Sequence, residues 1–462
     1  MRLSALLLSI PTLLLAACSD APVDEPETVE TETVDTEIET DSYQGDWSGT
    51  LDVGAAQLRL VLEVRGDNVA LISVDQSGAR MPVETNRRDA SGFSGHVAAV
   101  GASLELERVE TDILSGTFSQ GGSSFPLTLA RDRTRAVFYS SEPIAAESED
   151  FIAMSGDVRL AGTLDFPGDN DTYPAILLLN GSGSQDRNST VAGQPVFEVL
   201  ASALAERGIA TLRLDDRGIG GSELVAPASP HDLADDAAAA MSVLREQDGI
   251  NAQCVGILGH SEGGFIAFLA ADAADPAFIV SLAGMHGTMA ETLYEQSEAL
   301  FLAAGAGQAA ADQNRALQDA MFAVMRDETV EDYPAALTAA LVALGFPEDA
   351  AAQQGAIWGQ EYAISALDLD PTNAMRGYTG PIHAFFGERD LQVLAGPQST
   401  RLLAAREGLP TQITIVPGVN HLFQDATTGL PQEYANAPHA MSPEALDLIA
   451  DAAEGLIAQA CE

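Results

Sequence analysis

The hydrophobic and polar positions along the chain change their period near residue 150. Between residues 43 and 133, short runs alternate apolar and polar side chains and are separated by Gly, Asn and Asp, as in Trp47–Val53, Gln57–Val64 and Ser103–Val109. Alternation with a period of two, broken by turn residues about every ten positions, is typical of antiparallel strands that bury one face. Residues 43–133 are therefore expected to form a small antiparallel all-β domain, either a barrel or a sandwich.

From residue 151 to residue 462, nearly continuous apolar runs alternate with segments of helical spacing. The runs with strand character are Val158–Phe166, Ala175–Asn180, Val255–Leu258, Phe278–Leu282, Pro381–Phe386 and Thr411–Val416. Strands of this kind, separated by helices, indicate a mostly parallel, doubly wound sheet. The expected fold class of residues 151–462 is thus α/β, and a connector at about 134–150 leads into it.

A long insertion separates two of these strands. Nearly a hundred residues rich in Ala, Gln, Leu and Met lie between Leu282 and Pro381, and the stretches Glu291–Ala304 and Gln308–Arg326 have helical spacing. We expect residues 287–376 to form a helical cap over a pocket. Its Met and Phe side chains either pack the helices together or contact a substrate, and the pattern does not separate these alternatives.

A strand, a tight turn and a helix meet around Ser261. Residues 255–264 read Val-Gly-Ile-Leu-Gly-His-Ser-Glu-Gly-Gly, and a helical run follows them. This is the pattern G-x-S-x-G in the setting of a nucleophile elbow, where Gly259 and Gly263 stand at positions at which a Cβ would clash. The strained turn lifts the serine hydroxyl clear of the sheet. We predict that Ser261 is a nucleophile; the alternative is a Gly/Ser loop that matches the pattern by chance.

A serine nucleophile needs a base to take its proton and an acid to orient that base. Asp390 follows the strand Pro381–Phe386, and His421 follows the strand Thr411–Val416. Both therefore lie just past the C-terminal ends of strands, which is the edge where the sites of parallel sheets are found. We predict His421 as the base and Asp390 as the acid, with Glu388 as a competing acid in the same loop.

The other histidines fit the role of base less well. Of the seven in the chain, only His421 and His439 follow Asp390, and His439 lies in a segment expected to be a surface loop. His383 falls inside a strand, where a packed and hydrogen-bonded ring is expected. His260, inside the elbow, is interpreted as structural. For His286 a place at the rim of the pocket and a purely packed position remain equally open.

Acyl transfer also requires hydrogen-bond donors for the oxyanion. One donor is expected to be the backbone N–H of Glu262, the residue after the nucleophile. The other is expected in the glycine-rich loop after the strand Ala175–Asn180, from Ser182 or Gly183. A phosphate-binding loop is the competing interpretation, but the Walker lysine and the dinucleotide-binding glycine pattern are both missing there.

Five segments, in this order, resemble the bacterial α/β-hydrolases of the esterase and serine-aminopeptidase-like group. They are Asn180-Gly-Ser-Gly-Ser-Gln-Asp-Arg187, Leu212-Arg-Leu-Asp-Asp-Arg-Gly-Ile-Gly-Gly-Ser222, Gly259-His-Ser-Glu-Gly263, Gly387-Glu-Arg-Asp-Leu-Gln-Val393 and Asn420-His421. The resemblance covers about residues 151–462 and implies the α/β-hydrolase fold, with a catalytic triad of Ser261, Asp390 and His421. It also implies that the charged turn 215–218 braces the floor of the site. Ser184 stands where the group has proline, which leaves the second oxyanion donor open.

The β-rich segment 43–133 resembles a domain often fused to this group of hydrolases. It contains no constellation of residues that suggests chemistry of its own. The resemblance therefore places the chemistry in residues 151–462.

The first residues resemble a bacterial lipoprotein signal. Met1-Arg2 is a short basic region, Leu3–Leu15 is apolar but too short to span a bilayer, and Leu15-Ala-Ala-Cys18 is similar to a lipobox. We expect residues 1–17 to be removed and Cys18 to be acylated, which anchors the chain in a membrane. Ser19, in place of the aspartate linked to inner-membrane retention, favours the outer membrane of the bacterial envelope, facing the periplasm or the exterior. An ordinary secretory signal is the alternative.

Residues 18–42 are expected to be a disordered acidic tether. Ten acidic residues and several threonines occur between residues 19 and 42, where there is no aromatic or basic residue. Such a segment cannot bury enough apolar surface to offset the entropy of ordering it.

Charge and cysteine content limit the partners. The chain has 68 acidic residues and 22 basic ones, all arginine, for a net charge of −46, so nucleic acids, anionic lipid surfaces and polyanionic substrates are disfavoured.

Of the three cysteines, Cys254 and Cys461 remain once Cys18 is acylated; a disulfide is permitted in the periplasm, but the sequence does not show that they are close. No metal-ligand spacing appears, so neither a metal nor another cofactor is expected. The oligomeric state is not predicted.

Together these features predict a serine hydrolase that cleaves carboxylic esters through an acyl-enzyme. The substrate is expected to be a small-molecule ester. The first alternative is a serine peptidase of the aminopeptidase-like type acting on short peptides, in which Glu262 or an acid of the cap holds the substrate amine. The second alternative is an inactive binding lipoprotein of the envelope.

Overall fold

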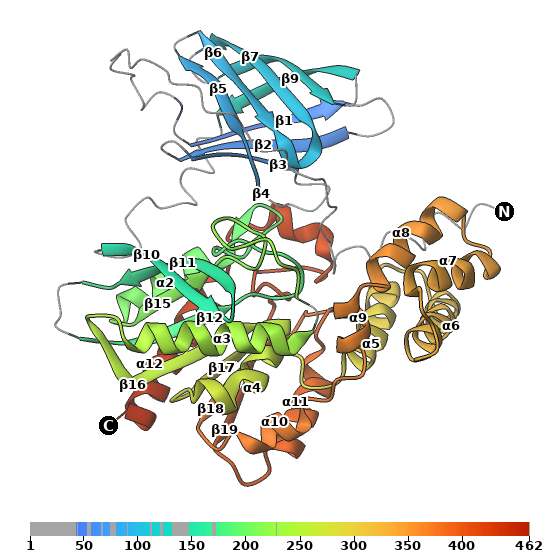
Figure 1. Cartoon of the computed structure of the whole chain (residues 1–462). Coiled ribbons are helices and arrows are strands. Elements are labelled where there is room, and N and C mark those ends of the chain that lie inside the picture. The colour runs from blue at the N-terminus through green and yellow to red at the C-terminus, as the bar shows by residue number, and fades with distance from the viewer. Residues whose placement is uncertain are drawn as a thin grey trace. The chain divides into compact units, whose positions relative to one another are not determined.

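The computed structural model describes residues 43–131 and 147–461, apart from short gaps at 44, 53–56, 66–67, 74–79, 90, 111–112, 121–122, 169–171 and 228. The expected signal, Cys18, the tether and most of the connector lie outside the described residues. The chain divides into two compact units, one built mainly from residues 17–142 and the other mainly from residues 143–462. Each unit is described by itself (Figure 1).

The first unit is one antiparallel sheet of nine strands in the order β4-β3-β2-β1-β9-β8-β7-β6-β5. The strands are β1 (Gly45–Asp52), β2 (Gln57–Arg65), β3 (Asn68–Ser73), β4 (Arg80–Pro82), β5 (Glu84–Asp89), β6 (Gly92–Val97), β7 (Ala102–Glu110), β8 (Ile113–Gln120) and β9 (Ser123–Arg131), with a 3-10 turn, η3 (Ala98–Val100), between β6 and β7. Only Val83 separates β4 from β5, and its N–H donates to the oxygen of Val69. The two ends of the strand order are therefore adjacent in the chain, as in an up-and-down barrel, which is one of the two alternatives left open by the sequence.

Alternating side chains fill the interior of this unit. Trp47, Leu62, Phe93 and Leu104 are fully buried, and they belong to one hydrophobic core. The indole N–H of Trp47 donates to the oxygen of Tyr43 at 2.8 Å, so its one polar group is satisfied inside the core. The period-two pattern of the sequence thus follows the inner face of the sheet.

The second unit is built around a mixed sheet of eight strands in the order β10-β11-β15-β12-β16-β17-β18-β19. The strands are β10 (Glu147–Ser155), β11 (Val158–Phe166), β12 (Tyr173–Leu179), β15 (Ala210–Leu214), β16 (Ile250–His260), β17 (Ile279–Leu282), β18 (Ile382–Gly387) and β19 (Thr411–Val416). β10, β11 and β15 pair antiparallel, whereas the strands from β15 to β19 run parallel. The predicted α/β class with a mostly parallel sheet is confirmed.

One boundary differs from the prediction. β10 begins at Glu147 and pairs with β11 from there, so the second unit starts before residue 151. The first four residues of β10 are Glu-Ser-Glu-Asp. Because these four positions are all polar, their pattern does not distinguish them from a connector.

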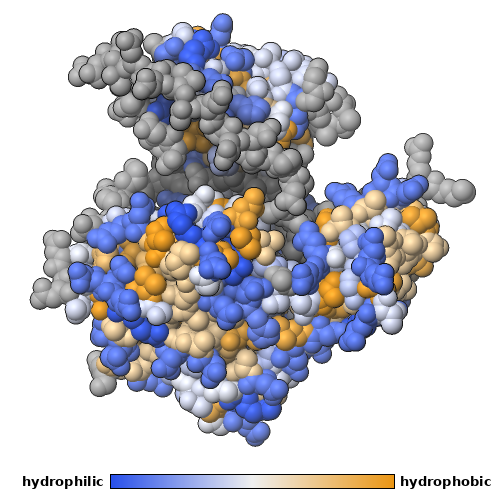
Figure 2. All heavy atoms as spheres, viewed as in Figure 1, coloured by the Kyte–Doolittle hydropathy of each residue, from blue (hydrophilic) through white to orange (hydrophobic). Residues whose placement is uncertain are grey.

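Helices cover the sheet. They are α2 (Val196–Glu206), α3 (Pro230–Arg245), α4 (Glu262–Ala274), α10 (Thr372–Gly377), α11 (Ala395–Ala405) and α12 (Pro443–Cys461), with a small hairpin of β13 (Thr190–Val191) and β14 (Gln194–Pro195) and a 3-10 turn, η4 (Pro431–Asn436). α3 packs beside α4, and α10 packs against both α4 and α11, while α2 packs against α12. Hydrophilic residues are spread over the visible surface (Figure 2), as expected for an acidic chain. Among the described helices, none has both the length and the apolar composition needed to cross a bilayer.

The insertion after β17 forms a group of helices. They are α5 (Met289–Ala303), α6 (Gln308–Met325), α7 (Tyr333–Ala343), α8 (Glu348–Trp358) and α9 (Glu361–Ala366). Phe322, Met325 and Leu337 are buried in a core that these helices share. The predicted range of the cap, 287–376, also includes most of α10, which packs on α4 and α11 instead, because helical spacing does not tell which layer a helix joins.

A disulfide joins Cys254 of β16 to Cys461 of α12, with 5.5 Å between their Cα atoms. It closes a loop across a sequence separation of 207 residues. In the chain-entropy account of disulfides, a loop of this size contributes up to about 5 kcal/mol, because the reduced unfolded chain has more conformations to lose.

We predict that Cys461→Ser lowers the free energy of unfolding by about 2–5 kcal/mol. The measurement is the midpoint of guanidinium unfolding under oxidising conditions. Wild type treated with a thiol reductant is the matched control and should have the same unfolding midpoint as the variant. Equal midpoints for the oxidised and reduced wild type would contradict the prediction.

Candidate active site

The backbone makes a sharp turn at the end of β16, with Ser261 between the strand and α4. Ser261 has φ 56° and ψ −118°, a conformation that costs a non-glycine residue about 1–3 kcal/mol. A Cβ on Gly259 would lie 2.1 Å from the oxygen of Gly263, and one on Gly263 would lie 2.3 Å from the oxygen of Leu179. Both positions therefore admit only glycine, which explains the glycines of the pattern and the placement of Ser261 at the tip of the turn.

Two further residues predicted from the sequence meet at the same edge of the sheet. His421, after β19, and Asp390, after β18, are hydrogen-bonded through Nδ1 and Oδ2 at 2.8 Å, and both are buried. The other carboxylate oxygen of Asp390 accepts the N–H groups of Gln392 at 2.8 Å and Val393 at 2.9 Å. The carboxylate is thus fixed by its own loop, and it holds the histidine with Nδ1 engaged, which leaves Nε2 for proton transfer.

The competing acid lies elsewhere. Glu388 is exposed, and its Oε2 accepts the N–H of Gly418 at 2.9 Å. It joins the loop after β18 to the loop that carries His421. The structure therefore brings Asp390, and not Glu388, to the imidazole.

His260 contacts His421 through a hydrogen bond and through its ring. Its Nε2 lies 2.9 Å from the backbone oxygen of His421, and the two rings are 4.8 Å apart. Burial lowers the pKa of His260 to about 3, so the ring is neutral. Because a carbonyl oxygen only accepts, Nε2 carries the proton and donates it, and this bond fixes the loop of the predicted base.

The remaining candidate histidines do not line the pocket beside Ser261. His286 is buried with its ring edge-on to Phe268 and Phe386, and it is not among the residues that line the pocket beside Ser261. Its position is the packed one of the two alternatives. His383 bonds through Nε2 to the hydroxyl of Thr414 in the neighbouring strand. His439 is exposed between η4 and α12.

The expected oxyanion donors lie on two segments. Glu262 is the first residue of α4, where backbone N–H groups have no partner within the helix and favour negative charge. Ser182 lines a pocket together with Ser261 and Glu262, whereas Gly183 is not among its lining residues. A Cβ on Gly181 would lie 3.2 Å from the Cβ of Ser261, so the loop packs directly on the nucleophile. Of the two alternatives, the structure brings Ser182 to the pocket.

Two carboxylates hold this loop in place. Asp216 accepts the N–H of Gln185 at 2.8 Å and the side-chain amide of Asn180 at 3.0 Å. Asp215 makes two hydrogen bonds to the Arg187 guanidinium, at 3.1 and 2.6 Å. The charged turn thus holds both ends of the segment 180–187, which contains Ser184.

Burial dominates the electrostatics near the nucleophile. It raises the pKa of Asp216 to about 7, although Asn180 and Gln185 oppose it. It also raises the pKa of the Glu262 side chain, against the hydroxyls of Tyr362 and Ser182, which favour the ionised form. For Asp215, burial opposes ionisation, but Arg187 and backbone N–H groups outweigh it, and the pKa is lowered.

Comparison with known proteins identifies the family of the chain. A model described as "Alpha/beta hydrolase family" matches residues 176–437, more than half of the chain. The chain belongs to the alpha/beta hydrolase family.

One relative and two solved structures illustrate what the chain is similar to. Esterase EstD of Thermotoga maritima is 25% identical over 304 residues, which cover 64% of this chain and 65% of that esterase, so the match spans just under two thirds of the relative's length. Among solved structures, Est1E from Butyrivibrio proteoclasticus has 14% identity and a TM-score of 0.39, covering 68% of this chain and 98% of its own. An esterase of Pyrococcus furiosus has 13% identity and a TM-score of 0.42, covering 68% of this chain and 92% of its own. The family assignment rests on the family model, because these scores are low.

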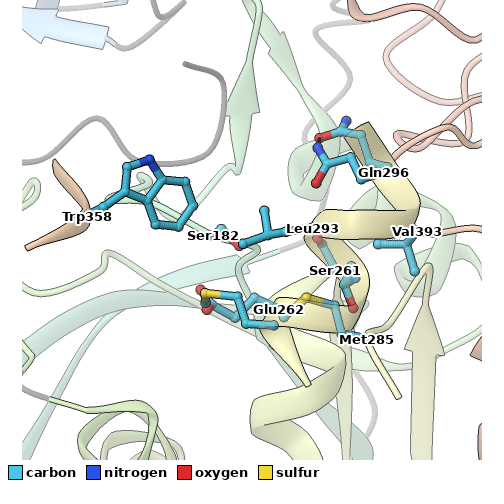
Figure 3. A pocket seen from close by; sticks show the side chains of 11 residues that line it. Ser182, Ser261, Glu262, Met285, Leu293, Gln296, Trp358 and Val393 are labelled. Atoms are coloured by element: carbon cyan, nitrogen blue, oxygen red, sulfur yellow. Dashed lines mark hydrogen bonds between the residues drawn. The ribbon is translucent and has the colours of Figure 1, made fainter. Parts of the chain in front are cut away.

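The pocket of the hydrolase next to Ser261 contains residues that sequence reasoning missed (Figure 3). Its lining consists of Ser182, Ser261, Glu262, Met285, Met289, Thr292, Leu293, Gln296, Trp358, Gln392 and Val393. The four from α5 share one signal in the sequence, because positions 289, 292, 293 and 296 have the spacing of a single helix face. Of the Met side chains of the insertion, Met325 packs in the cap core, and Met289 packs against that core and also lines the pocket.

The described part of the hydrolase contains no group of three or more His, Cys, Asp or Glu side chains placed to hold a metal ion. The chemistry that this site can perform with its own groups is nucleophilic attack by Ser261, with proton transfer through His421.

Proposed function

We propose that the chain is a serine hydrolase that cleaves carboxylic esters through a Ser261–His421–Asp390 triad. The observation that carries the proposal is the His421–Asp390 hydrogen bond, at the same edge of the sheet as a serine held in a strained elbow. The named relative, an esterase, supports the choice of substrate class.

The proposed reaction uses these three residues in turn. The Oγ of Ser261 attacks the ester carbonyl while Nε2 of His421 takes the hydroxyl proton, and Asp390 stabilises the resulting imidazolium. The N–H of Glu262 and a donor near Ser182 bind the oxyanion. Collapse of the adduct breaks the bond to the alcohol, which receives the proton from His421. Water then attacks the acyl-enzyme with the same histidine as base, and the carboxylic acid leaves.

We expect p-nitrophenyl acetate and butyrate to be cleaved about a hundredfold or more faster than alanine and proline p-nitroanilides, in kcat/KM. Amines are poorer leaving groups than phenolates, and Glu262 is the one ionisable side chain of the pocket lining that can pair with a substrate amine. p-Nitrophenyl octanoate should be slower than butyrate, since the pocket beside Ser261 is small.

The matched control for these rates is Ser261→Ala, which measures the background of each substrate. A preference for the anilides would favour the peptidase alternative, with the Glu262 carboxyl as the anchor of the amine. No Ser261-dependent turnover of any substrate would favour an inactive binding protein.

We also propose that the mature protein begins at an acylated Cys18 and is anchored in the outer membrane of a bacterial envelope. The Leu15-Ala-Ala-Cys18 ending of the apolar stretch motivates this, and the Cys254–Cys461 disulfide fits an oxidising compartment. Mass spectrometry of the native N-terminus should find lipid on Cys18, and the protein should fractionate with outer membranes. Cys18→Ser should release it without detergent. An unmodified N-terminus would remove the lipoprotein proposal.

A further inference from the structure

The lining of the pocket beside Ser261 combines apolar and polar side chains. Met285, Leu293 and Val393 are apolar side chains of its lining, but Gln296 and Gln392 also line it. Both glutamines are buried, with 6% and 8% of their surface exposed. Burying an amide costs free energy unless its hydrogen bonds are made, so the partners of these two groups decide what the pocket can bind.

Gln296 occupies a position where an apolar residue would be expected. On α5, Met289, Thr292 and Leu293 precede it at the spacing of one helix face, which is the face toward the pocket. Figure 3 shows Gln296 reaching in from α5 at one end of the pocket, with Glu262 and Met285 toward the other.

The two amides differ in how well they are satisfied. The Nε2 of Gln392 donates to the hydroxyl of Tyr434 at 2.6 Å, which fixes that side chain. Among the described residues, Gln296 makes one hydrogen bond, in which its Nε2 donates to the Oε1 of Gln392. The distance is 3.5 Å, the outer limit of such a bond. An amide has two donor hydrogens and two acceptor lone pairs, so most of the capacity of Gln296 is open to a ligand.

The position of His421 assigns this pocket to one side of the ester. The leaving alcohol must lie beside His421 to receive its proton, and His421 is not among the lining residues of this pocket. The pocket therefore takes the acyl part. Its small volume suits a short acyl chain.

We propose that Gln296 is a specificity-determining residue that hydrogen-bonds an oxygen on the acyl chain, so that the preferred substrates are esters of short oxo or hydroxy acids. This inference rests on the proposed esterase function and names its substrate class. The oxygen supplied by such an acyl chain completes the hydrogen bonding of an amide that is otherwise buried with one long contact.

The test compares methyl 4-oxopentanoate with methyl pentanoate, which differ in one carbonyl group, by pH-stat titration of the acid released. Wild type is expected to favour the oxo ester by about tenfold or more in kcat/KM. Gln296→Met keeps the length of the side chain but removes the amide, and it is expected to bring the ratio to about one or below. Leu293→Met, on the same helix face, is the matched control and should keep the wild-type ratio whatever its absolute rate.

Each ratio is measured on a single protein sample, so the fraction of active enzyme cancels. A wild-type ratio of one or less, or a ratio in Gln296→Met equal to that of wild type, overturns the inference while Ser261-dependent hydrolysis leaves the esterase function standing. No Ser261-dependent hydrolysis of either ester or of p-nitrophenyl acetate overturns both. A preference that is lost in Gln296→Met and kept in Leu293→Met supports the assignment.

Discussion

A fluorophosphonate probe is expected to label the wild-type chain at Ser261 and to leave Ser261→Ala unlabelled. The reason is the elbow, in which the hydroxyl stands at the tip of a strained turn beside the first N–H groups of α4. We expect the substitution to lower kcat for p-nitrophenyl acetate by roughly 10⁴-fold or more, since what remains is binding and oxyanion stabilisation. Peptide mass spectrometry locates the label, and initial rates give kcat.

A matched control is Ser399→Ala on α11, which removes a serine outside the site and should leave labelling and rate unchanged. Circular dichroism and the unfolding midpoint establish that Ser261→Ala is folded. Undiminished labelling of Ser261→Ala would overturn the assignment of the nucleophile.

His421→Ala is expected to cost about as much in kcat as Ser261→Ala, because the members of a triad act as a unit. Asp390→Asn should cost roughly 10⁴-fold, since the asparagine reverses the hydrogen bond at Nδ1 and favours the wrong tautomer. Glu388 cannot replace the lost carboxylate, as it is exposed and bonded to Gly418. The measurement is kcat/KM for p-nitrophenyl acetate as a function of pH.

The matched control for the base is His439→Ala, which removes an exposed histidine and should be close to wild type. If His439→Ala lost activity and His421→Ala kept it, the assignment of the base would be wrong. A mild effect of Asp390→Asn alone would mean that contacts other than the Asp390 carboxylate orient the imidazole of His421.

The sequence predicted the features that depend on local rules. Ser261 was predicted because a close backbone contact at 259 and at 263 admits only glycine. The sequence therefore shows a glycine at both positions. Asp390 and His421 were found because parallel strands end at one edge. Their catalytic roles stay predictions until the variants are measured.

The features that were missed depend on contacts between distant segments. Nothing near Gln392 in the sequence indicates Tyr434 as its partner, and nothing near Glu262 indicates that Tyr362 of the cap faces its carboxyl. The pairing of Cys254 with Cys461 likewise needs the fold, because α12 returns to β16 from the far end of the sequence. The connector was predicted to reach residue 150 because the first residues of β10 are polar.

The insertion between β17 and β18 contributes side chains to the pocket but none of the three proposed catalytic residues. α5 to α9 come from one continuous stretch, and they supply Met289, Leu293, Gln296 and Trp358 to the pocket. The proposed nucleophile, acid and base all lie outside that stretch. Substitutions confined to that stretch can therefore change the shape of the pocket while the three proposed catalytic side chains stay in place.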